Sequence, residues 1–173
     1  MLVAGATGVI GRPLVPLLVR SGHAVAGLTR ANGDLVRELG AEPIVCDVYD
    51  LARLRSLVAA FAPEIVVDLL TDLPDERERL PDHAAANSRI RREGTRNLLA
   101  AAPGARFIAE SVAFELPGDA GAAVAELERL VPEVIRLDYL CGPGTYDPDC
   151  TGDGARIHVA DAARLFAEAV GTA

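Results

Sequence analysis

The chain contains no lysine and no tryptophan, and all 17 of its basic residues are arginine. Any mechanism that needs the ammonium group of a lysine is therefore excluded. Aromatic residues make up only 4% of a chain that is 50% hydrophobic, so aliphatic side chains must fill the core. The formal net charge of −8 argues against a nucleic-acid partner, because binding phosphates requires clustered positive charge.

Long hydrophobic runs are also missing. None approaches the roughly 20 residues that cross a membrane, and an apolar run that begins at Met1 or Leu2 leaves no room for a signal peptide. The three cysteines, Cys46, Cys141 and Cys150, are odd in number and lack C-x-x-C spacing. The sequence thus indicates neither a disulfide framework nor a metal site, and we expect a cytoplasmic protein that does not bind membranes.

What is present is an alternation of short apolar runs and helical patterns over the length of one domain, 1–173. It predicts a mostly parallel, doubly wound α/β sheet with helices on both faces and right-handed crossovers. The first expected strand begins at Met1 or Leu2 and ends before Gly5, and the others are 24–28, 43–46, 65–70, 106–109, 134–137 and 157–159. The expected helices are 12–20, 34–39, 51–61, 82–102, 120–131 and 160–170. Residues 142–154, rich in Gly, Pro and Asp, are expected to form a loop.

The first eleven residues, M-L-V-A-G-A-T-G-V-I-G, combine an apolar strand with a glycine-rich turn at the start of a helix. Gly5 permits a tight turn, Gly8 lets the backbone approach a phosphate, and Gly11 lets the helix pack close to the strand. A pyrophosphate can then lie at the positive end of that helix. The pattern favours a dinucleotide site, and an ordinary glycine-rich turn between strand and helix is the alternative.

Several segments together resemble the extended and atypical short-chain dehydrogenase/reductase superfamily, the NAD(P)-dependent epimerase/dehydratase group. They are G-A-T-G-V-I-G at 5–11, G-T-R-N-L-L-A-A-A at 94–102, A-E-S-V-A-F at 109–114, R-L-D-Y-L-C-G-P-G at 136–144 and I-H-V-A-D-A-A-R at 157–164. The resemblance implies a Rossmann-like fold with NAD(P) across the carboxyl ends of the strands. The cofactor residues expected from the glycine turn and the resemblance are Gly5, Thr7, Gly8, Val9, Ile10, Gly11, Thr29, Arg30, Asp47, Val48, Leu69 and Leu70.

The choice between NADP(H) and NAD(H) depends on the end of the second strand. Sites selective for NAD place an acid there to bind the ribose 2′-hydroxyl. This chain has Leu28-Thr29-Arg30 instead, and a guanidinium can pair with a 2′-phosphate. Arg12 could add a second positive charge. We expect NADP(H) to be favoured over NAD(H), with a solvated loop residue as the alternative role of Arg30.

The sequence departs from the family at the catalytic positions that the resemblance implies. The usual Asn is Arg91, the Ser position corresponds to Ser111, and the helix 117–131 that should carry Tyr-x-x-x-Lys contains neither residue. The usual proton relay is therefore absent. Gly144 and His158 are only 14 positions apart where relatives carry a substrate-binding segment, so we expect the substrate lobe to be largely missing.

Ser111, Tyr139 and Tyr146 remain as catalytic candidates, although an unactivated phenol is a poor acid or base at neutral pH. His158 is interpreted as a hydrogen-bonded structural residue at a strand end, and Asp161 as an acid that stabilises the start of a helix. Three functions stay open: an oxidoreductase or isomerase of atypical mechanism acting on an unidentified small molecule, a non-catalytic NADP-binding redox sensor or regulator, and a Rossmann scaffold for non-redox chemistry. The resemblance also implies a homodimer formed through helices 82–102 and 118–131.

Overall fold

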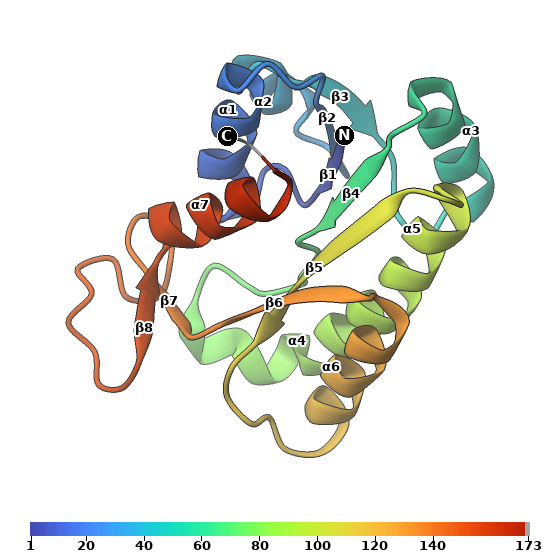
Figure 1. The fold of residues 1–173 in the computed structure, drawn as a ribbon. Helices are drawn as coiled ribbons and strands as arrows, with labels where there is room; N and C mark the ends of the chain where they lie inside the picture. Colours follow the sequence, from blue (N-terminus) through green and yellow to red (C-terminus); the bar gives the residue numbers. More distant parts are fainter. Residues whose placement is uncertain (172–173) are drawn as a thin grey trace.

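Six parallel strands form the main sheet of the computed structural model, which describes residues 1–171 (Figure 1). The strand order is β3-β2-β1-β4-β5-β6, and every neighbouring pair runs parallel. The order therefore reverses between β1 and β4, which confirms the doubly wound prediction. The bounds are Leu2–Ala4 for β1, Ala26–Thr29 for β2, Glu42–Val45 for β3, Ile65–Asp68 for β4, Arg106–Val112 for β5 and Glu133–Leu137 for β6.

Helices cover both faces of this sheet (Figure 1). One face carries α1 (Gly11–Arg20), α2 (Gly33–Glu38) and α7 (Val159–Ala169). The other carries α3 (Leu51–Phe61), α5 (Thr95–Ala101) and α6 (Gly118–Leu130), with α4 (Leu80–Arg89) packed on α6 after the 3-10 turn η1 (Arg77–Arg79). Within residues 1–171, no helix has the length and apolar character to cross a membrane.

The long helix expected over 82–102 is one continuous helical run with an irregular centre. Between α4 and α5 lies a π-helical segment, η2 (Ile90–Gly94). Such a segment widens the backbone turn by one residue and is frequent at functional sites. Here it faces the side chains at the carboxyl ends of β4 and β5.

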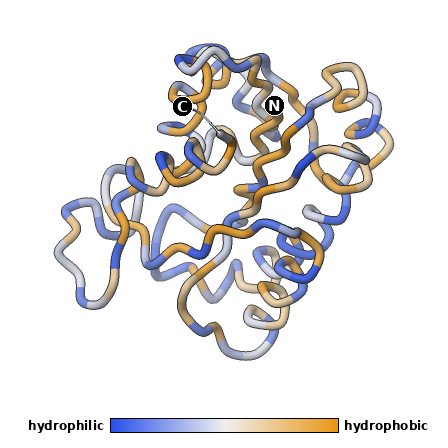
Figure 2. The backbone as a smooth tube through the Cα atoms, viewed as in Figure 1, coloured by the Kyte–Doolittle hydropathy of each residue, from blue (hydrophilic) through white to orange (hydrophobic). Residues whose placement is uncertain are grey.

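The core is aliphatic and lies on both sides of the central strands, which Figure 2 shows as hydrophobic while the outer loops are mostly hydrophilic. Strand β1 is fully buried on both faces, as a parallel strand between two helical layers must be. Phe166 of α7 is the largest fully buried side chain and packs in the cluster formed with α1.

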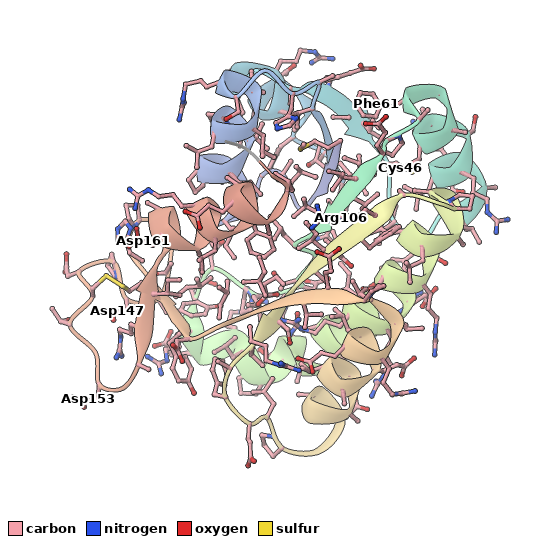
Figure 3. All side chains as sticks on the ribbon, viewed as in Figure 1. Cys46, Phe61, Arg106, Asp147, Asp153 and Asp161 are labelled. Carbon is pink, nitrogen blue, oxygen red and sulfur yellow. A yellow bond between two sulfur atoms is a disulfide. The ribbon has the colours of Figure 1, made fainter. Side chains whose placement is uncertain are left out.

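The segment after β6 forms a separate two-stranded parallel sheet from β7 (Tyr139–Cys141) and β8 (Arg156–His158). The loop between them carries Asp147, which accepts hydrogen bonds from the Thr151 and Gly152 amides and from Arg156. Cys141 and Cys150 are joined by a disulfide, the yellow bond near Asp147 in Figure 3. The expectation of no disulfide was therefore wrong, because the loop returns Cys150 to the strand that holds Cys141.

The packing predicts a contrast between two neighbouring residues of α7. Phe166 is 0% exposed and Leu165 is 40% exposed. We expect Phe166→Ala to lower the unfolding free energy by about 3–5 kcal/mol through lost burial and the cavity left behind. Leu165→Ala should change it by less than about 1 kcal/mol. Urea unfolding of both variants checks this, and equal losses would contradict the assignment of Phe166 to the core.

Candidate functional site

The glycine turn after β1 brings α1 unusually close to the strand. Gly5 has φ +81°, a conformation that favours glycine, and the Gly8 amide donates to the Gly5 carbonyl at 3.0 Å. A Cβ on Gly11 would overlap the carbonyl oxygens of Gly5 and Ala6. The N-cap residue of α1, Ile10, makes no side-chain cap hydrogen bond. Within α1, however, the Arg12 and Leu14 amides donate to the Gly8 and Ile10 carbonyls at 3.0 Å, and Pro13 has no N–H. An anion at this end of the helix would therefore be bound by amides of the glycine turn that precedes it.

A pocket of about 350 Å³ opens beside this turn, at the carboxyl ends of β1, β2, β3 and β4. A Cβ on Gly8 would meet one neighbouring atom, the Gly5 carbonyl oxygen, at 3.2 Å. Most of the predicted cofactor residues line the pocket: Gly5, Thr7, Gly8, Thr29, Arg30, Asp47, Val48, Leu69 and Leu70.

The other three predicted cofactor residues lie outside the pocket lining. Ile10 is a buried core residue, and Gly11 is packed against the turn. Val9 faces the loop after β7, where a Cβ on Gly144 would lie 3.4 Å from Val9 Cγ1. The sequence pattern correctly located the turn, but it did not distinguish residues that face the pocket from residues that pack α1 against the sheet.

Several lining residues were not predicted. They include Tyr49, whose ring lies 3.9 Å from the Arg89 guanidinium carbon of α4. The Asp47 carboxylate accepts the Tyr49 amide at 2.9 Å, and burial raises the pKa of the Tyr49 phenol. The complete additional set is Leu28, Ala31, Asn32, Cys46, Tyr49, Thr71 and Ile90. Except for Ile90, which lies in η2, these residues share a position at or just after a strand end.

Two arginines near the turn have different roles. The Arg12 Nε donates to the Thr7 carbonyl at 2.8 Å, which holds this side chain against the turn. Arg30 instead reaches from the end of β2 to Asp72, with Nη1 and Oδ2 3.6 Å apart. Thr29 provides a hydroxyl beside it, 3.5 Å from that of Thr7. Arg30 is therefore the positive charge at the pocket rim.

The three candidate catalytic hydroxyls are dispersed, and none lines this pocket. Ser111 is fully buried and its hydroxyl donates to Glu128 of α6 at 2.6 Å. The Tyr146 hydroxyl donates to the Pro74 carbonyl. Tyr139 is 52% exposed and stacks on Phe114, with ring centroids 4.1 Å apart. The structure does not bring the three together.

A buried polar cluster lies at the ends of β4 and β5 instead. Asp68 accepts the Thr95 hydroxyl at 2.7 Å and the Leu70 amide at 3.1 Å. Arg91, 5% exposed on η2, donates to the Glu110 carboxylate at 3.1 Å. Burial raises the pKa of both Asp68 and Glu110, and Arg91 opposes the shift. Sequence reasoning identified the Arg91 position but not its partner.

The interpretation of His158 as structural is supported by its contacts. Its Nδ1 accepts the Ala160 amide at 3.2 Å and so caps α7. Asp161, in the first turn of that helix, pairs with Arg164. Both residues stabilise the start of α7 and lie outside the pocket lining.

A parallel sheet with a glycine turn and a pocket where the strand order reverses defines a Rossmann-type dinucleotide-binding protein. The chain belongs to the NAD dependent epimerase/dehydratase family, whose family model matches residues 1–114. It is 40% identical over 177 residues to a Streptomyces protein named 3-diazoavenalumate denitrifying reductase, covering 84% of this chain and 57% of that protein. It is 36% identical over 137 residues to dTDP-4-dehydrorhamnose reductase of Streptomyces griseus, covering 78% and 40%. The chain thus spans about half the length of these relatives.

Solved structures share the fold at low sequence identity. UDP-glucose 4-epimerase from Brucella ovis in complex with NAD superimposes with a TM-score of 0.76 at 20% identity, over 98% of this chain and 72% of that one. WbmH of Bordetella bronchiseptica in complex with NAD+ gives 0.75 at 18% identity, over 98% and 70%. These likenesses confirm the predicted Rossmann-like fold.

The buried Asp68 predicts how stability depends on pH. Because its pKa is raised above the ordinary 3.8, the folded state holds this proton more tightly than the unfolded state. The contribution of this proton to the unfolding free energy is complete below pH 3.8 and is lost as pH rises through the pKa of Asp68 in the folded state. We therefore expect the unfolding free energy of Asp68→Asn, relative to wild type, to increase from about pH 4 to about pH 8.

Glu133 gives a control of opposite sign. Its hydrogen bond from Arg106 lowers the pKa, so its contribution is present above the ordinary 4.5 and is lost as pH falls. The unfolding free energy of Glu133→Gln should thus be closest to that of wild type at acid pH. Urea titrations across the pH series measure both, and a constant difference for Asp68→Asn would contradict the assignment.

Proposed function

We propose that this chain binds NADP(H) in the pocket beside the glycine turn and acts as a reductase that needs no tyrosine–lysine relay. The carrying observation is the pocket itself, which lies where the strand order reverses and is lined by the glycine turn of an NAD-dependent family. No lysine exists in the chain to support the usual relay.

The residues present fit a dinucleotide. Gly8 leaves the side of the turn open, and amides of the glycine turn, at the positive end of α1, can bind a pyrophosphate. The hydroxyls of Thr7 and Thr29 lie beside that path. Asp47 and Tyr49 border the end of the pocket at β3, where the adenine would lie.

Arg30 supports NADP(H) over NAD(H). The end of β2 carries no carboxylate that would bind a ribose 2′-hydroxyl and repel a 2′-phosphate. The Arg30 side chain is 63% exposed at the rim and can present a planar fork of N–H donors to a phosphate.

The relative named 3-diazoavenalumate denitrifying reductase suggests a substrate class, a diazo compound. When bound, the reduced nicotinamide would supply a hydride for a new C–H bond at the diazonium carbon; the C–N bond would break, dinitrogen would leave with the electron pair of that bond, and the cofactor would be oxidised. No alkoxide forms in this net reaction, so no side chain has to protonate one. This chemistry is compatible with Ser111, Tyr139 and Tyr146 lying outside the pocket lining.

The test combines binding with turnover. We expect calorimetry to show NADPH binding, and an aryl diazonium salt to cause release of dinitrogen in step with nicotinamide oxidation. Gly8→Val should abolish both, because its side chain would occupy the pyrophosphate position. A triple variant, Ser111→Ala, Tyr139→Phe and Tyr146→Phe, should retain turnover within about threefold. If one of these hydroxyls acted as a general acid or base, its removal would instead slow turnover by roughly 10²–10⁴.

Reactions without protein and with the Gly8→Val variant correct for direct reduction of the diazonium salt by NADPH. Wild type that binds neither NADPH nor NADH would contradict the proposed function. Loss of turnover in the folded triple variant would instead show that at least one of these hydroxyls takes part in the reaction.

A non-catalytic NADP-binding regulator is the second candidate. It is favoured by the engagement of two of the three hydroxyls, Ser111 with Glu128 and Tyr146 with Pro74. Tight cofactor binding with no oxidation by diazonium or carbonyl compounds would select this function over the reductase.

We also propose a homodimer formed through α4, α5 and α6. The exposed side of α6 carries small residues, including Ala122 and Ala125, that permit close approach of a second helix. A specific interface of this kind buries roughly 1,000 Å² or more.

We expect sedimentation at micromolar concentration to give a dimer, Ala125→Arg to give a monomer, and Ala59→Arg on the exposed side of α3 to remain dimeric. A monomeric wild type would contradict the proposal.

A further inference from the structure

The ion pair between Arg30 and Asp72 crosses the mouth of the pocket. Arg30 follows β2 and Asp72 lies in the segment after β4, while β1 with its glycine turn lies between these two strands in the sheet. Adjacent strands are about 4.8 Å apart, so the pair bridges roughly 10 Å over the end of β1. Arg30 and Thr71, the residue before Asp72, both line the pocket.

The two partners are held very differently. The Asp72 amide donates to Asn87 Oδ1 of α4 at 3.0 Å, and its carboxylate lies 3.4 Å from His83 Nδ1 of the same helix. The Asp72 side chain is 19% exposed, whereas that of Arg30 is 63% exposed. At 3.6 Å the contact between them is an ion pair without a hydrogen bond. Asp72 is thus the fixed acceptor, and Arg30 is the partner that can move.

We propose that Asp72 is a specificity-determining residue that limits the preference for NADP(H), because it competes with the 2′-phosphate for Arg30. This inference rests on the proposed function. Binding NADP(H) requires Arg30 to leave Asp72 and turn to the phosphate, where a forked, charge-assisted contact replaces a longer one. Binding NAD(H) brings no such phosphate, so the pair can stay in place. Asp72 therefore acts on Arg30 as a positioning residue.

The experiment measures the affinities of NADPH and NADH for wild type, Asp72→Asn and Asp75→Asn by calorimetry. Asp75 is exposed in the same segment and has no ion pair with Arg30, so Asp75→Asn removes an equal charge without changing that pair. We expect Asp72→Asn to bind NADPH about three- to tenfold more tightly, because a competing anion is gone, with NADH changed by less than about twofold. Asp75→Asn should leave both affinities near wild type.

The Arg30→Ala background separates competition for Arg30 from a general effect on the loop. There, Asp72→Asn should no longer change the ratio of the two affinities. The inference is overturned if Asp72→Asn shifts both cofactors equally or weakens NADPH, or if its effect on the ratio survives in Arg30→Ala. Wild type that binds neither cofactor overturns the proposed function as well, whereas binding with an unchanged ratio overturns only the role of Asp72.

Discussion

The close approach of α1 to the end of β1 is the constraint on which the rest of this structure depends. A side chain at Gly11 would overlap the carbonyls of Gly5 and Ala6, and one at Gly5 would come within 2.7 Å of the Leu69 carbonyl. Larger residues here would push α1 from the sheet and open the core that α1 shares with α7. The same turn contributes Gly5, Thr7 and Gly8 to the pocket lining, so one glycine-rich segment both lets α1 pack on the sheet and borders the pocket.

Polar residues that follow apolar strands are the second organising feature. Asp68 and Glu110 are buried where β4 and β5 end, and each takes a partner from the helical run α4–η2–α5. A buried carboxylate without a partner would be costly, so these contacts are required by the fold. Arg91 stands at the position where the family usually has an asparagine, and here it neutralises Glu110. Because Arg91 is committed to this structural ion pair, the position cannot serve the family's usual proton relay.

The loop between β7 and β8 ties distant parts of the chain together near the turn. Its Tyr146 hydroxyl bonds to the Pro74 carbonyl in the segment that carries Asp72, and Gly144 lies against Val9. The disulfide and the Asp147 contacts give this loop a defined shape. The pocket is bordered by the glycine turn and the segments after β2, β3 and β4, and the β7–β8 loop contacts two of these segments, the turn and the segment after β4, from outside the lining.

The sequence by itself determined the alternation of strands and helices. Strands buried on both faces must be continuous apolar runs, and helices that cover a sheet must carry an apolar residue every three to four positions. It also determined the glycine turn, since few other residues tolerate that backbone. Only the tertiary structure decided the pairing of Cys141 with Cys150, of Arg91 with Glu110 and of Arg30 with Asp72. It also decided that Ser111 faces Glu128 rather than the pocket. Side-chain partners of this kind depend on how strand ends and loops meet in space, and no local periodicity encodes that geometry.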